Sequence, residues 1–212
     1  MVTLDLQEQE RVEALKAWWN DNGKWLMLAI VLAAAVFGAM RGWQYWHAKQ
    51  NVEAAMLFAE VIKQVSSNDP KRVNDAAAAV VDRYGSTINA TRAELLAAQV
   101  NIQFGDGATA ATQLQWVIDH ASDENLQDVA RLKLASLRLD EKKYDDALKL
   151  LDAEHPDSFT GLYVDLKGDV LSAQGKKDEA RAAYRQALDK IDAKSNYREL
   201  IQMKLDALGG AK

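Results

Sequence analysis

The feature that most constrains this chain is a run of sixteen uncharged, mostly apolar residues, WLMLAIVLAAAVFGAM, at residues 25–40. At about 1.5 Å per residue, a helix of this length spans some 24 Å, which is short of the roughly 30 Å hydrocarbon core of a bilayer. Extension through residue 46 gives an adequate length and places aromatic residues at both rims, as in membrane proteins. The run therefore predicts a transmembrane signal anchor over residues 25–46, with Trp25 at one rim and Trp43, Tyr45 and Trp46 at the other.

Three alternatives compete with a membrane span. A buried helix of a globular protein seldom has aromatic residues at both ends. A cleaved secretory signal would have a long, net acidic leader, and Phe37 stands where a small residue is expected before a cleavage site. An amphipathic surface helix is disfavoured because the run has no polar face. A spanning anchor fits the residues best.

The leader, residues 1–24, is predicted to be an amphipathic arm. Val12, Leu15 and Trp19 share one face of a helix over residues 4–19, and the turn-forming sequence NDNG at residues 20–23 is expected to break that helix. Basic residues near the two sides of the span are equal in number, so the positive-inside rule leaves the orientation open.

Within the span, small residues recur every four positions on one helical face, at Ala34, Gly38 and Gly42. This spacing allows close packing of transmembrane helices, which makes the three residues a candidate packing surface. Small residues are also common in such helices without any partner, and that alternative stays open.

Composition excludes several classes of function. The formal net charge is −5, which gives no basic surface for nucleic acid. The chain has no cysteine, so it has no disulfide, thiolate catalyst or thiolate metal site. Its three histidines have no metal-ligand spacing, and no Walker A, GxGxxG or GxSxG sequence occurs. We therefore expect a protein that is not an enzyme and that has no catalytic residues, metal or cofactor.

The sequence after residue 46 predicts an all-α domain. It is rich in alanine, contains no alternating strand pattern, and has only two prolines, both in polar breaks between helices. Large and small residues also recur in it at a fixed period, close to the tetratricopeptide repeat of about 34 residues. One copy carries Leu134, Ala135, Tyr144, Ala147 and Leu151, and the next carries Gly168, Gly175, Ala180, Tyr184 and Ala187.

Two further copies extend the pattern toward the N-terminus. One contains Ala98, Gly105, Ala110 and Leu114, and its longer step to the next copy implies an insertion around residues 122–125. The other, residues 52–84, keeps only helix, turn and helix, while residues 196–208 have the amphipathic pattern of a capping helix. The predicted fold is a single N-terminal transmembrane helix followed by a tetratricopeptide-like α-solenoid over residues 47–212. A plain helical bundle is the alternative.

In such solenoids the first helix of each pair lines a concave groove. A mixture of apolar and polar side chains there suits an extended or unfolded peptide. The candidate partner-binding residues are Arg92, Leu95, Gln99, Ile102, Gln103, Leu132, Ser136, Leu139, Asp140, Asp165 and Asp169. The alternative is that many of them pack against neighbouring helices.

The whole layout resembles a known family. The leader contains VEALKAWWNDNGKWL, the anchor ends in RGWQYWHAKQ, and the repeats contain SDENLQDVARLKLASLRLD and VDLKGDVLSAQGKKDEARAAYRQAL before the ending IQMKLDAL. These segments are similar to the YfgM family, the ancillary subunit of the bacterial SecYEG translocon. The likeness covers nearly the entire chain and is weakest over residues 52–84.

The resemblance implies a single-pass protein of the bacterial inner membrane, with a cytoplasmic arm and a periplasmic repeat domain. It also implies association with the SecYEG translocon and with a membrane-anchored periplasmic chaperone of the prolyl-isomerase type, and a role in passing emerging, unfolded polypeptides to periplasmic folding factors. The alternative is a structural or regulatory adaptor, which clamps a fixed partner or sequesters a cytoplasmic stress regulator through the arm.

Overall fold

The computed structural model describes residues 2–209, with side chains from residue 8 onward. Residue 1 and residues 210–212, the ends of the predicted arm and repeat domain, lie outside the described residues. Across residues 2–209 the chain is helical and contains no strand, which confirms the predicted all-α class. The chain divides into two compact units, Met1–Gln50 and Asn51–Lys212, and each is described by itself.

The first helix, α1 (Val2–Val65), is continuous, so the predicted break at residues 20–23 is wrong. The side chains in this stretch support the helix instead of ending it. Asn22 Nδ2 donates to the carbonyl oxygen of Trp18 at 3.1 Å, and the Trp19 indole covers Gly23. A single helical glycine costs only about 1 kcal/mol, which the helical turns on both sides offset.

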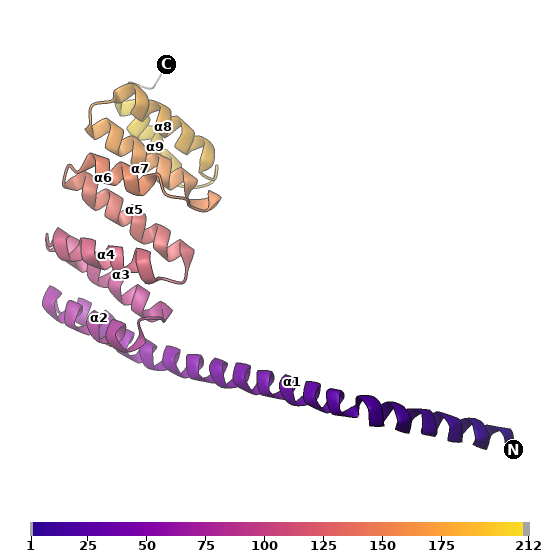
Figure 1. The fold of residues 1–212 in the computed structure, drawn as a ribbon. Coiled ribbons are helices and arrows are strands. Elements are labelled where there is room, and N and C mark those ends of the chain that lie inside the picture. Colours follow the sequence, from indigo (N-terminus) through magenta and orange to yellow (C-terminus); the bar gives the residue numbers. More distant parts are fainter. Residues whose placement is uncertain (1, 210–212) are drawn as a thin grey trace. The chain divides into compact units, whose positions relative to one another are not determined.

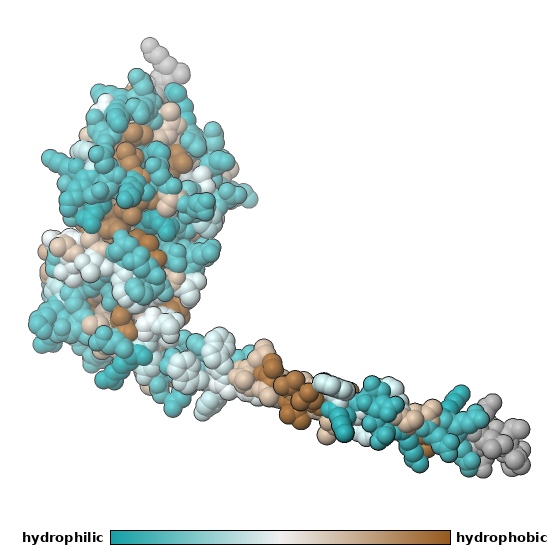
Figure 2. Space-filling view, viewed as in Figure 1, coloured by the Kyte–Doolittle hydropathy of each residue, from teal (hydrophilic) through white to brown (hydrophobic). Residues whose placement is uncertain are grey.

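One stretch of α1 has the length and composition to cross a membrane, judged over the described residues. This stretch is almost entirely exposed within the chain. Figure 2 shows its apolar side chains gathered in one band, with hydrophilic residues on the N-terminal side. Ala34, Gly38 and Gly42 are exposed in this band, and a Cβ atom added at Gly38 or Gly42 would have no atom within 4 Å.

The second unit is a stack of antiparallel helix pairs (Figure 1). The end of α1 pairs with α2 (Pro70–Tyr84), α3 (Ile88–Gln103) with α4 (Gly107–His120), and α5 (Glu124–Asp140) with α6 (Tyr144–Leu151). A 3₁₀ turn, η1 (Asp157–Phe159), precedes the pair of α7 (Thr160–Ala173) and α8 (Lys177–Lys190), and α9 (Tyr197–Ala207) follows as the predicted cap. The predicted solenoid with a C-terminal capping helix is therefore confirmed.

Polar residues at the helix starts explain where the helices begin. Asp69, Thr87, Asp106 and Asp123 each accept a hydrogen bond from a backbone N–H in the first turn of the following helix. The helices α6 and α8 have no such cap and instead carry acidic pairs in the first turn, where the helix dipole favours negative charge.

The turn inside each repeat uses the same left-handed backbone position. Gly105 has φ 81° and Gly175 has φ 79°, a conformation that glycine adopts without steric cost. Lys142 takes the same place between α5 and α6 with φ 59°. The middle repeat therefore keeps the turn geometry although it lacks the glycine.

Buried residues form four clusters that follow the helix pairs along the stack. Ala98 and Ala135, the predicted small positions in α3 and α5, are fully buried. Gly168 is the equivalent residue in α7, and there the Tyr184 ring of α8 takes the space of a missing side chain. Small residues thus let the paired helices approach closely, as the repeat pattern predicted.

Replacing Gly168 with alanine is expected to lower the free energy of unfolding by about 1–3 kcal/mol, the usual cost of overpacking a core. The new Cβ would lie 2.6 Å from Cε1 of Tyr184. That ring is buried, and its hydroxyl donates to Asp169 at 2.8 Å, so it has little freedom to move. Thermal unfolding followed by circular dichroism tests this, with Gly38→Ala as the uncrowded control. Equal melting temperatures for the two variants would contradict the packing argument.

Candidate protein-interaction surface

Successive first helices are joined by polar contacts that span about one repeat. Lys133 Nζ of α5 donates to Gln99 Oε1 of α3 at 2.8 Å. The Tyr163 hydroxyl of α7 donates to Asp128 Oδ1 of α5 at 2.6 Å. The Tyr197 hydroxyl of α9 donates to Asp165 Oδ2 of α7 at 2.6 Å. These contacts fix the positions of the helices that were predicted to line a groove.

The apolar members of the predicted groove pack against the core. Leu95 and Ile102 contact the cluster around α4, and Leu132 and Leu139 contact the cluster that contains Tyr163. All four are only partly exposed. Their main role in the described chain is to hold adjacent helices together.

The two aspartates of the predicted groove form an ion cluster with the cap. Asp165 is 1% exposed, and Lys204 Nζ of α9 lies 2.8 Å from both Asp165 Oδ2 and Asp169 Oδ2. Burial alone would lower the pKa of Lys204, but hydrogen bonds to the two carboxylates raise it above its ordinary value. Burial, together with the neighbouring Asp165 charge, raises the pKa of Asp169 above its ordinary value although the shared Lys204 acts to lower it. The cluster fastens α9 to α7.

The remaining polar candidates stay accessible. Arg92, Gln103 and Asp140 are exposed, and Gln99 and Ser136 are half-buried. The structure therefore separates the predicted residues into an accessible polar set on α3 and α5 and a set that joins neighbouring helices, and Gln99 belongs to both because it accepts from Lys133.

Several residues of these contacts were absent from the sequence prediction. Asp128 is 2% exposed, and it forms an ion pair with Arg131 besides accepting from Tyr163. Burial raises the pKa of Tyr163 to about 12. The sequence does carry a signal for these contacts between helices. It is a pair of complementary polar residues about one repeat apart, as with Asp128 and Tyr163 or Asp165 and Tyr197.

Among the described residues, one glutamate is buried without a compensating charge. Glu94 of α3 is 8% exposed and belongs to a buried stripe with Thr91, Ala98 and Asn101. Burial raises the pKa of Glu94 to about 7. Asn101 lies in the same stripe but is satisfied, because its amide nitrogen donates to Asn74 Oδ1 at 2.8 Å and to Gln113 Oε1 at 2.7 Å.

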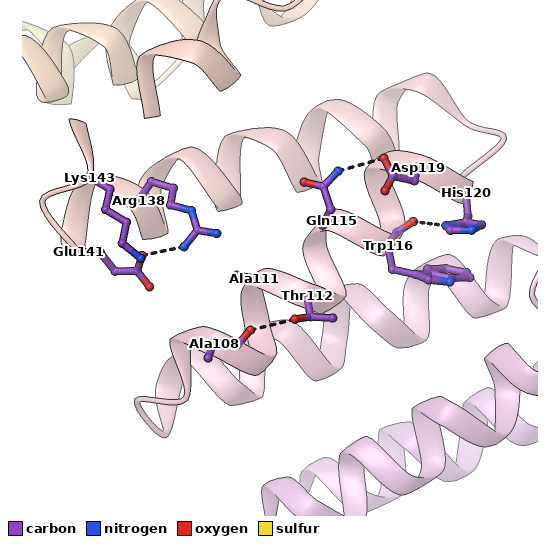
Figure 3. Close-up of a pocket in the computed structure, with 10 residues that line it drawn as sticks. All are labelled: Ala108, Ala111, Thr112, Gln115, Trp116, Asp119, His120, Arg138, Glu141 and Lys143. Carbon is purple, nitrogen blue, oxygen red and sulfur yellow. Dashed lines mark hydrogen bonds and ion pairs between the residues drawn. The ribbon is translucent and has the colours of Figure 1, made fainter. Parts of the chain in front are cut away.

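A shallow cavity of about 630 Å³ lies between α4 and the end of α5 (Figure 3). On one side Trp116 and His120 stack with ring centroids 4.8 Å apart. On the other, Glu141 forms ion pairs with Arg138 at 2.7 Å and Lys143 at 2.9 Å. The two basic groups share one carboxylate, and among the described residues no group of three metal-ligating side chains occurs. The cavity thus offers an aromatic and charged surface suited to protein contact.

Comparison with known proteins shows which family has this architecture. Residues 16–210 match the family model of the tetratricopeptide repeat-like domain. The ancillary SecYEG translocon subunit of Neisseria gonorrhoeae is 35% identical over 96% of this chain and 98% of its own length. The subunit of the same name from Escherichia coli K12 is 32% identical over 95% of this chain and 96% of its own length. This chain therefore belongs to the family of ancillary SecYEG translocon subunits with a tetratricopeptide repeat-like domain.

Proposed function

We propose that this chain is a membrane-tethered, non-catalytic protein-binding subunit, which works beside the SecYEG translocon and passes translocated polypeptides to periplasmic chaperones. The observation that carries the proposal is the likeness, over nearly the full chain, to relatives named as ancillary SecYEG translocon subunits. The long apolar helix supports the membrane tether, and the repeat-like domain supports binding of protein chains.

The proposed organisation follows the family resemblance. Residues 1–24 form a cytoplasmic arm, residues 25–46 cross the inner membrane, and residues 47–212 lie in the periplasm. The chaperone partner is a membrane-anchored prolyl isomerase. In the span, Ala34, Gly38 and Gly42 form the packing face toward another transmembrane helix.

Tethering to the membrane explains how weak contacts with a polypeptide are enough for the proposed function. Confinement beside the translocon raises the effective concentration of the binding surface, so modest affinity permits both capture and release. The accessible polar residues Arg92, Gln103 and Asp140 are the proposed contacts on α3 and α5, together with the half-buried Gln99 and Ser136.

The test is gentle detergent extraction of the tagged full-length protein from its native membranes, with mass spectrometry of the proteins that co-purify. We expect translocon subunits and a periplasmic prolyl isomerase, both lost when residues 25–46 are replaced by an unrelated spanning helix. Recovery of neither from the unaltered protein would refute the proposal.

A second variant, lacking residues 4–19, distinguishes a subunit that transfers polypeptides from an adaptor that acts on a cytoplasmic regulator through the arm. A transfer subunit keeps its translocon association without the arm. Loss of a cytoplasmic partner, with unchanged secretion, would instead assign the function to the arm and favour a regulatory adaptor.

A further inference from the structure

The second helix of the middle repeat is unusually short. α6 has 8 residues, whereas α4 and α8 have 14 each. At 1.5 Å per residue, α6 lacks about 9 Å of helix relative to its neighbours. After Leu151 the chain enters a loop that contains Pro156 and then η1.

A cavity of about 450 Å³ lies beside the end of α6, with walls from α7 and α8. Its lining includes the buried apolar side chains Leu151, Leu171 and Ala183 and the buried ring of Tyr163. The Tyr163 hydroxyl is already bound to Asp128, and His155 stacks on the ring with centroids 4.0 Å apart. The accessible apolar surface of the cavity therefore comes from the half-buried Val164 and the exposed Ala182. We call this cavity the α6 notch.

The neighbouring repeats indicate what a longer α6 would place here. By the repeat register, Val117 of α4 and Ala187 of α8 correspond to position 154, and both are fully buried in their own repeats. In the middle repeat the corresponding residue is Glu154, which is exposed. The chain's own helix therefore ends before this position and leaves a notch there, which is lined by apolar side chains and by His155 of the following loop.

An acidic cavity of about 540 Å³ adjoins the notch, and His155 lines both. Within it Asp128 and Arg131 neutralise each other as an ion pair. Glu124 and Glu154 are exposed, and neither forms an ion pair with any residue that the structure describes. Glu179, which lines the notch itself, is also exposed and has no ion pair among the described residues, whereas Lys167 of the lining is paired with Asp152 at 3.0 Å. Three uncompensated negative charges thus lie in or beside the notch.

We propose that the α6 notch binds a short helical segment of a partner protein, with an apolar face and a lysine or arginine at one end. The apolar face takes the place of the missing turns of α6, and the basic residue meets Glu124, Glu154 and Glu179. This surface lies on α6, α7 and α8, with Glu124 at the start of α5, and it shares no residue with the accessible polar set on α3 and α5. The inference does not depend on the proposed function.

The test uses two fluorescent synthetic peptides with the same amphipathic helical sequence, one ending in two lysines and the other in two glutamates. Binding to the full-length protein in nanodiscs of zwitterionic lipid is measured by anisotropy, with empty nanodiscs as the blank. We expect the lysine peptide to bind about fivefold or more tightly than the glutamate peptide. Equal binding of the two peptides, or no binding of either, would overturn the proposal.

Two sets of variants locate the site. Ala182 is exposed and lines the notch, so Ala182→Trp should fill it and weaken binding of the lysine peptide about tenfold or more. Arg185→Trp, on an exposed position of the same helix outside the notch lining, is the matched control and should bind as the parent does. Replacing Glu124, Glu154 and Glu179 with glutamine should remove the preference for lysine. Equal effects of the two tryptophan variants would place the peptide elsewhere.

Discussion

Replacing Lys204 with methionine is expected to lower the free energy of unfolding of the repeat domain by about 2–4 kcal/mol, near the cost of breaking a buried ion pair. Lys204 is the cation that Asp165 and Asp169 share, and Asp165 is 1% exposed. Methionine keeps the apolar stem but leaves the Asp165 carboxylate buried without a positive partner. In a chain of this length the melting temperature should fall by roughly 5–15 °C. Thermal unfolding of the full-length protein in detergent, followed by circular dichroism, measures the change.

The matched control is Lys190→Met in α8. Lys190 is exposed and forms no ion pair with any described residue. Such a surface change should alter stability by less than about 0.5 kcal/mol. Hydrogen exchange then separates local from global effects, because loss of the cluster should speed exchange first in α9. Equal stability of the two methionine variants would show that the cluster contributes nothing to holding the cap.

Replacing Glu94 with glutamine is expected to stabilise the protein at pH 8 and to leave it nearly unchanged at pH 4.5. The pKa of Glu94 is about 7 in the folded chain, above its ordinary value of 4.5. Between these values the folded state binds more protons than the unfolded state, so the unfolding free energy falls as pH rises from about 4.5 to 7. The full cost is present above pH 7 and amounts to at most about 3 kcal/mol. Glutamine avoids that cost because it carries no charge.

Denaturant unfolding at a series of pH values tests the Glu94 prediction. The difference in unfolding free energy between the variant and the parent should grow from about pH 4.5 to 7 and stay constant above that. Glu199→Gln, on the exposed surface of α9, is the control and should run parallel to the parent. If the unfolding free energy of Glu94→Gln also ran parallel to that of the parent across the pH series, Glu94 would ionise in the folded chain as easily as in water.

Local and periodic signals in the sequence predicted most of the fold. The apolar run at residues 25–40 identified the one described helix with the composition of a membrane span. Ala98, Ala135 and Gly168 marked the helix crossings, because a close approach of two helices requires a small side chain wherever it occurs. The capping helix was also predicted, since its amphipathic pattern is a property of its own residues.

The NDNG sequence at residues 20–23 shows where local signals mislead. Turn-forming residues lower helix propensity by only about 1 kcal/mol each, and contacts such as that of Trp19 with Gly23 decide the outcome. The sequence likewise did not show which of the groove candidates are buried and which are exposed. Asp165 and Arg92 are both charged residues of first helices, yet one is buried under the cap and the other is exposed.

The sequence by itself determined the all-α class, the repeat period and the position of the apolar segment, because each depends on residues close together along the chain. The tertiary structure alone decided which polar side chains pair across repeats, as with Lys204 and Asp165, and where α6 leaves an open notch. These features depend on the distance between residues a whole repeat apart, which is set when the helices stack and bury their apolar faces.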